Sequence, residues 1–201
     1  MDAAQSAVLS ALVLYFSPGG NTRQGGRGRG AGTGEPRRRR ALAELSDGKE
    51  LALEDYDLVC LGAPSYHFDV PAPVKRWAEE QVRAGNRDGL VRLGAPARPG
   101  KWAAVFITYG GPHTGLAEAT PAGDHLAQLC VHLGRQVRAV WYTLGEFHGD
   151  RDQPNNQYGL LGDIRGRPDE HDLAVAARNA AGLAHGLQHE KALLNTAREG
   201  A

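Results

Sequence analysis

The sequence is poor in cysteine, has no excess of charge of either sign and contains no long apolar run. Its two cysteines, Cys60 and Cys130, each lie among apolar neighbours, at a spacing typical of neither a disulfide framework nor a metal site. We expect two reduced thiols in the core. Lysine plus arginine number 23, as do aspartate plus glutamate, so the formal net charge of zero argues against a general attraction to nucleic acid or anionic membranes.

The first residues of the sequence lack the basic opening of a secretory signal peptide. The apolar run that follows is about ten residues long, which is too short to span a membrane. We therefore expect a cytoplasmic protein with no membrane partner and no nucleic-acid partner. The 201 residues are 41% hydrophobic and 23% charged, which suits one globular domain with a substantial core.

Apolar segments with the character of strands alternate along the chain with segments of helical periodicity. The predicted strands cover residues 11–16, 58–62, 102–108 and 137–142. The predicted helices cover residues 71–84, 116–133 and 169–187. This alternation predicts an α/β fold in which helices cover both faces of a parallel sheet.

The loop Ser17-Pro-Gly-Gly-Asn-Thr22, directly after the first predicted strand, is the most informative segment. It offers two hydroxyls, a side-chain amide and glycine N–H groups, and it contains no acidic residue. Because glycine lets the backbone approach a ligand closely and free N–H groups bind anions, such a loop can surround a phosphate. An ordinary strand-to-helix turn is the alternative.

This loop and two later segments resemble the flavodoxin family. The loop carries the family's Ser, Gly, Asn and Thr in register, with Gly19 where the family prefers Thr. Residues 56–68 are similar to the third strand and the loop beneath the flavin ring, and residues 102–111 to the fourth strand and the loop over its other face. The resemblance implies a three-layer fold, a five-stranded parallel sheet in the order 2-1-3-4-5, and noncovalently bound FMN.

The resemblance also implies which residues hold the cofactor; it implies no catalytic side chain and no metal ligand. The FMN phosphate is expected to lie against Ser17, Gly19, Gly20, Asn21 and Thr22. The N5 edge and one face of the ring are expected to lie against Pro64, Ser65, Tyr66, His67 and Phe68. The pyrimidine edge and the other face are expected to lie against Thr108, Tyr109, Gly110, Gly111, His113 and Gly115. All three loops leave the carboxyl ends of predicted strands, where parallel sheets bind ligands.

Several of these side chains have more than one interpretation. Tyr66 or Tyr109 suits stacking on the flavin, and the alternative is an anchor of a surface loop. His67 and His113 could place positive charge near N1 of the reduced ring, or they could be solvated loop residues. Outside the loops, His185 and His189 share a helix face but lack the Glu of the H-E-x-x-H zinc motif.

Residues 24–40 depart from the family pattern. Six glycines and six arginines lie among these seventeen residues, without an apolar stripe, so we expect a disordered or loose loop in place of the first helix. A polyanion-binding arm, a tolerated insertion or loss, and a locally shifted reading frame are competing explanations. We favour the last, because the pattern stops after Thr22 and resumes near Ala41. Under each of the three explanations, the phosphate loop is expected to lose the helix that should follow it.

We expect a single flavodoxin-like domain over residues 1–201, with a long polar connection at 145–168 that covers the site or forms a subunit contact. The implied function is electron transfer through FMN, with a redox partner protein or NAD(P)H as the electron source. Neutral charge departs from the acidic carriers of the family, which keeps an NAD(P)H-dependent quinone reductase, usually an oligomer, as the alternative. A fold that no longer binds flavin is the third possibility.

Overall fold

The computed structural model describes residues 8–31, 40–45, 51–149 and 153–200. Its sheet has five parallel strands in the order β2-β1-β3-β4-β5, which confirms the predicted fold class. The strands are β1 (Ala11–Tyr15), β2 (Arg40–Glu44), β3 (Leu58–Pro64), β4 (Trp102–Tyr109) and β5 (Gln136–Leu144). The chain order reverses between β1 and β3, so the loops after these two strands diverge at the carboxyl edge of the sheet.

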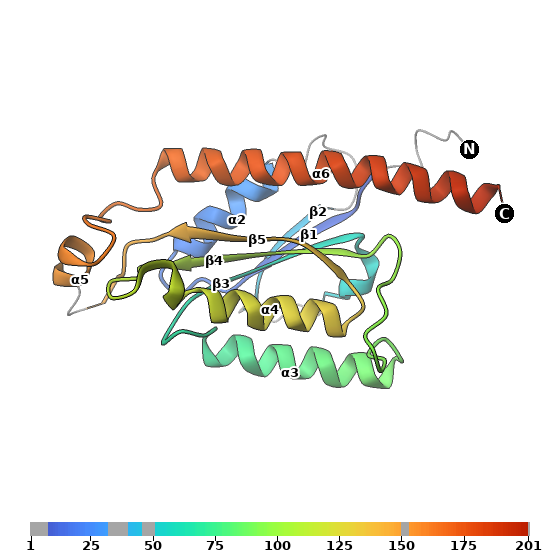
Figure 1. Ribbon diagram of the computed structural model, residues 1–201, viewed down its shortest axis with the longest axis horizontal. Helices are drawn as coiled ribbons and strands as arrows, with labels where there is room; N and C mark the ends of the chain where they lie inside the picture. The colour runs from blue at the N-terminus through green and yellow to red at the C-terminus, as the bar shows by residue number, and fades with distance from the viewer. Residues whose placement is uncertain (1–7, 32–39, 46–50, 150–152, 201) are drawn as a thin grey trace.

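Helices cover both faces of this sheet (Figure 1). On one face lie α3 (Ala72–Arg87) and α4 (Thr120–His132), and on the other lie α2 (Asn21–Ala31) and α6 (Glu170–Glu199). A 3₁₀ helix, η3 (Gly115–Glu118), precedes α4, and the short α5 (Gln153–Tyr158) precedes α6. No helix in the described part of the chain is both long and apolar enough to cross a membrane.

The central strands are stabilised on both faces, because successive side chains alternate between two apolar layers. All five residues of β1 are buried. Leu12 and Leu14 pack in the core beneath α3 and α4, whereas Val13 and Tyr15 pack in the core beneath α6. Since side chains alternate along a strand, a strand buried on both faces is a continuous apolar run. That property made β1, β3 and β4 predictable.

The loose loop predicted for residues 24–40 is wrong for residues 24–31, which belong to α2. Gly25 and Gly26 are buried. A Cβ on Gly26 would lie 3.3 Å from Cδ1 of Tyr15 and 3.6 Å from Cζ of Phe106. The glycine therefore lets α2 approach the sheet closely, and packing compensates for its low helix propensity. Residues 32–39 lie outside the described residues, and Arg40 begins β2.

The last helix begins where predicted and ends later. Asp169 caps α6: its carboxylate accepts a hydrogen bond from the Asp172 N–H at 2.9 Å, and the Asp172 carboxylate accepts one from the Asp169 N–H at 3.0 Å. This reciprocal pair satisfies two N–H groups at the start of the helix. The helix continues to Glu199 rather than ending at 187, and Leu194 of the extension packs against the core.

Both cysteines lie in the core, as predicted. Burial raises the pKa of the Cys130 thiol to about 12. Since the thiolate is the reactive form of cysteine, Cys130 is a packing residue at neutral pH and not a nucleophile.

Candidate functional site

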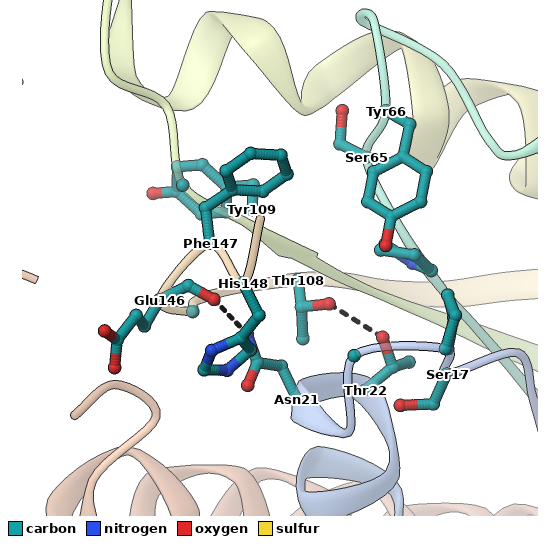
Figure 2. Close-up of a pocket in the computed structure, with 15 residues that line it drawn as sticks. Ser17, Asn21, Thr22, Ser65, Tyr66, Thr108, Tyr109, Glu146, Phe147 and His148 are labelled. Atoms are coloured by element: carbon teal, nitrogen blue, oxygen red, sulfur yellow. Dashed lines mark hydrogen bonds between the residues drawn. The ribbon is translucent and has the colours of Figure 1, made fainter. Parts of the chain in front are cut away.

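The loops after β1, β3, β4 and β5 surround a cleft with two adjoining parts, an inner and an outer cavity, that share lining residues. Figure 2 shows the inner cavity. The inner cavity, at the start of α2, encloses about 470 Å³ of empty space, and the outer cavity, beside α5, encloses about 1260 Å³, open solvent at their mouths included. The residues that line both are Ser65, Tyr66, Tyr109, Gly110, Phe147 and His148.

Most of the sequence-predicted site residues line this cleft. Those at the inner cavity are Ser17, Gly19, Asn21, Thr22, Pro64, Ser65, Tyr66, Thr108, Tyr109 and Gly110. Those that line the outer cavity alone are His67, Phe68, Gly111 and His113. Gly20 and Gly115 line neither, but their φ angles of +90° and +66° are left-handed conformations that favour glycine and shape the two loops.

A fourth loop was not among the predicted site residues. Gly145, Glu146, Phe147 and His148, which follow β5, line the inner cavity, and Asn155, Asn156 and Ile164 line the outer one. Other lining residues missed from sequence are Pro18, Pro112 and Glu118. Described residues of the long connection 145–168 therefore line the cleft, and the two interpretations of this connection, a cover over the site and a subunit contact, both stay open.

The loop after β1 presents a set of backbone donors to the inner cavity. Because α2 begins at Asn21, the loop keeps its helix N-terminus, contrary to the prediction. The Ser17 hydroxyl accepts a hydrogen bond from the Arg23 N–H at 2.9 Å, and the Gly20 carbonyl accepts one from the Gln24 N–H at 3.1 Å. Within the described residues, the N–H groups of Gly19, Gly20, Asn21 and Thr22 have no acceptor. Four free donors at a helix N-terminus are an arrangement that can bind an anion.

Side chains tie this loop to its neighbours (Figure 2). The hydroxyls of Thr22 and Thr108, both buried, lie 2.7 Å apart and join the start of α2 to the end of β4. The side-chain amide of Asn21 donates to the Glu146 carbonyl at 2.7 Å. Asn21 therefore lines the cavity while one N–H of its side-chain amide is bound to the protein, and the backbone supplies most of the free donors of this loop.

The charges around the cleft leave anion binding to those backbone groups. Among the described residues that line the two cavities, none is lysine or arginine. The Glu118 carboxylate accepts hydrogen bonds from the N–H groups of His113 at 2.7 Å and Thr114 at 2.6 Å. The Glu146 carboxylate accepts one from the Gly166 N–H at 2.8 Å. Both carboxylates are thus bound to the protein's own backbone.

Two tyrosines flank the cleft. Burial raises the pKa of Tyr66. Burial also raises the pKa of Tyr109, against a smaller opposing effect of the Arg167 charge. The Tyr109 ring packs edge to face on Tyr142, with centroids 6.5 Å apart and planes at 86°. Both phenols are therefore neutral at physiological pH, and a neutral ring held edge-on suits contact with a planar aromatic ligand.

A strained turn carries part of this aromatic lining. The Tyr66 N–H donates to the Asp69 carbonyl at 2.8 Å, and the Asp69 N–H donates to the Tyr66 carbonyl at 3.1 Å. Between them, His67 and Phe68 have φ angles of +50° and +65°. Two positive φ angles in succession define a hairpin turn usually filled by Asn-Gly, so a bulky residue here is strained. Strain of this kind concentrates at functional sites.

Replacing Phe68 by glycine is expected to relieve that strain. Phe68 is 58% exposed, so little buried contact is lost, and glycine adopts the positive φ freely. We expect the free energy of unfolding of Phe68→Gly to rise by about 1 kcal/mol in urea denaturation. The control is Phe68→Ala, which removes the same ring but keeps a Cβ at the strained position. Equal stabilities of the two variants would show that the turn stores no strain.

Asp69 fastens the turn to the neighbouring helices. Its carboxylate lies 2.5 Å from Nζ of Lys75 and 3.2 Å from Nδ1 of His125, and it accepts the Val70 N–H at 2.7 Å. Burial alone would raise the pKa of Asp69, but the hydrogen bonds from Lys75 and Val70 and the charge of His125 outweigh it and lower the pKa. The ionised form therefore stabilises the folded state.

This anchor predicts a pH-dependent stability. Because the folded-state pKa of Asp69 lies below its unfolded value of about 3.9, its contribution is present above that value and is lost as pH falls through the folded pKa. Asp69→Asn is expected to be less stable than the parent chain at pH 7, with a difference that shrinks toward pH 3. Urea denaturation at the two pH values measures it, and a difference that stays constant would contradict the assignment.

The sheet order, and the loop with free N–H groups at its switch point, define a flavodoxin-like α/β protein. No family model matches the chain. Among solved structures, an archaeal flavodoxin superposes with a TM-score of 0.59 at 18% identity, over 90% of this chain and 100% of that chain. A flavodoxin from Bacillus cereus gives 0.60 at 17%, over 88% and 97%. The flavodiiron protein from Giardia intestinalis gives 0.60 at 13%, over 96% and 39%. The chain therefore has the flavodoxin-like fold.

Curated relatives add a sequence similarity that covers part of the chain. A protein of Erythrobacter litoralis is 36% identical over 75 residues, which are 37% of this chain and 38% of that protein. One of Pseudomonas syringae pv. tomato is 30% identical over 124 residues, 58% of this chain and 61% of that protein. Both relatives are named FMN-dependent NADH:quinone oxidoreductases. The matches span between 38% and 61% of the length of the first four such relatives.

Proposed function

We propose that this chain binds FMN noncovalently and transfers electrons through it. The observation that carries the proposal is the set of free N–H groups at Gly19–Thr22, at the N-terminus of α2 and at one end of an aromatic-lined cleft. A phosphate and a planar ring joined by a short chain match those two environments. The FMN dependence named for the curated relatives and the fold shared with flavodoxins support the same cofactor.

Each part of the cleft has a distinct task in this function. The backbone of Gly19, Gly20, Asn21 and Thr22 binds the phosphate through charge-assisted hydrogen bonds. Tyr66 and Tyr109 bind the ring, and Tyr109 is oriented by Tyr142. FMN itself supplies the reversible electron acceptance, so the protein contributes placement, exclusion of water and electrostatics.

The outer cavity favours an NADH-dependent quinone reductase over a carrier that exchanges electrons with protein partners alone. It adjoins the inner cavity through Tyr66, Tyr109 and Phe147 and offers about 1260 Å³ of empty space, open solvent at its mouth included, which leaves room for a second planar molecule beside the ring site. The formal net charge is zero, so the chain also lacks the excess of negative charge that steers an acidic carrier to a basic partner. The electron donor is then NADH and the acceptor a quinone, as the curated relatives' names state for those proteins.

Anaerobic reduction of the FMN-loaded chain separates the two modes. We expect NADH to bleach the flavin absorbance within seconds and a soluble benzoquinone to restore it. A chain that ignores NADH but accepts electrons from a reductase protein, at a rate that depends on ionic strength, is a carrier. A chain whose bound flavin reacts with none of these would contradict the proposed electron transfer.

A further inference from the structure

We propose that Asn156, on α5, is a positioning residue that fixes the aromatic side chain of Phe147 against the flavin ring. The inference rests on the proposed function, because it assigns Phe147 to the ring end of the FMN site. Phe147 lines both the inner and the outer cavity, and Asn156 lies behind it in the wall of the outer cavity. The two residues come from the long connection after β5, for which sequence offered no residue roles.

The side chain of Asn156 makes two hydrogen bonds with the backbone of one residue, Phe147. Its Oδ1 accepts a hydrogen bond from the Phe147 N–H at 3.0 Å, and its Nδ2 donates to the Phe147 carbonyl at 2.9 Å. Asn156 is 2% exposed, which is rare for an asparagine. A primary amide suits this contact because it offers a donor and an acceptor on separate atoms, whereas a carboxylate offers acceptors alone and an aliphatic side chain offers neither.

The loop is held from several sides. The Glu146 carbonyl accepts the Asn21 side-chain amide at 2.7 Å, the Glu146 N–H donates to the Arg167 carbonyl at 2.7 Å, and the Gly145 N–H donates to the Tyr109 carbonyl at 2.9 Å. Phe147 follows directly in the chain, and the two hydrogen bonds from Asn156 hold its backbone. Through Asn21 the same loop contacts the start of α2, so it connects the phosphate end of the cleft to the ring end.

The backbone of Phe147 matters for the cavity because the residue is only partly packed. Phe147 is 46% exposed, so packing constrains it less than it would a core residue, and the position of its backbone matters more. Asn156 itself is fixed on the fold: its carbonyl accepts the Ile164 N–H at 2.8 Å, and the nearby Leu160 N–H donates to the Pro112 carbonyl at 2.7 Å. A rigid support behind a half-exposed aromatic residue is an arrangement that positions a ligand-contacting group.

Asn156→Asp tests the role, because it keeps the size and the acceptor but removes the donor. The matched control is Gln157→Glu, the same amide-to-acid change one residue along α5. The measurements are the affinity for riboflavin, which lacks the phosphate, the affinity for FMN, and the visible spectrum of the bound flavin. We expect Asn156→Asp to weaken binding of both flavins by the same factor, about tenfold, and to shift the spectrum, with the ratio of FMN to riboflavin affinity unchanged.

The outcomes separate this inference from the proposed function. A folded Asn156→Asp chain with the spectrum and riboflavin affinity of the control would overturn the positioning role while leaving FMN binding intact. A parent chain that binds no flavin would instead contradict the proposed function. If Asn156→Asp does not fold, Asn156→Gln, which keeps both hydrogen-bonding groups but displaces them by one methylene, is measured in the same way, and the same spectral shift is expected. Phe147→Ala should give that shift, and Phe147→Ala combined with the Asn156 variant should add nothing further.

Discussion

Ser17→Asp is expected to lower the affinity of the chain for FMN at least about 100-fold while leaving its affinity for riboflavin nearly unchanged. Ser17 lines the inner cavity beside the four free N–H groups, and its hydroxyl accepts the Arg23 N–H. Aspartate can accept that same hydrogen bond, and the nearby N-terminus of α2, which begins at Asn21, favours a negative charge, so folding is expected to persist. Its added negative charge would repel a phosphate in the adjacent cradle.

The control for that experiment is Ser17→Asn, which has nearly the same shape as the aspartate variant but no charge. Fluorescence titration with FMN and riboflavin gives the affinities, and thermal unfolding of each variant verifies the fold. If the two variants bind FMN equally well, the phosphate does not lie at this loop, and the assignment of the cradle fails.

Gly62→Ala is expected to destabilise the chain by about 3 kcal/mol. A Cβ at Gly62, in the centre of β3, would lie 2.1 Å from Cζ and 2.2 Å from Cε2 of Phe106. Phe106 is 1% exposed, so its ring is enclosed and has no free space into which it can turn. The glycine is thus required by the packing of β3 against the β4 side chain, beneath α2.

Gly182→Ala provides the matched control on α6. A Cβ there meets nothing within 4 Å, and alanine favours a helix over glycine by about 1 kcal/mol, so we expect a modest gain in stability. Denaturant unfolding measures both variants. A Gly62→Ala chain as stable as the parent would mean that the Phe106 ring is not enclosed as described.

The sequence predicted the buried strands well because their physical signal is local. A strand that is covered on both faces is apolar at every position, as β1 and β3 are. β2 was missed because it is a short edge strand that carries Arg40 and the half-exposed Leu42. The helical part of residues 24–40 was missed for another reason: helix propensity counts a glycine as unfavourable, whereas Gly26 is needed for contact with Tyr15 and Phe106.

The cleft likewise has parts that follow from local sequence signals and parts that depend on contacts between separate segments. The loops at Ser17, Tyr66 and Tyr109 directly follow predictable strands, so their meeting at one edge of the sheet follows from the parallel topology. The loop at Phe147 also follows a strand, but hydrogen bonds to Asn21 and Asn156 set its position. The residues so joined are 125 and 9 positions apart, and no periodicity in the sequence reveals such pairs.

Comparison of FMN with riboflavin binding to the purified parent chain tests the central claim most directly. If the loop after β1 holds a flavin phosphate, the fluorescence of FMN should be quenched on binding, with a dissociation constant of about 1 μM or tighter. Riboflavin should bind at least about tenfold more weakly, because it cannot make the charge-assisted hydrogen bonds of the phosphate. A folded chain that binds neither flavin, or that binds both equally, would contradict the account.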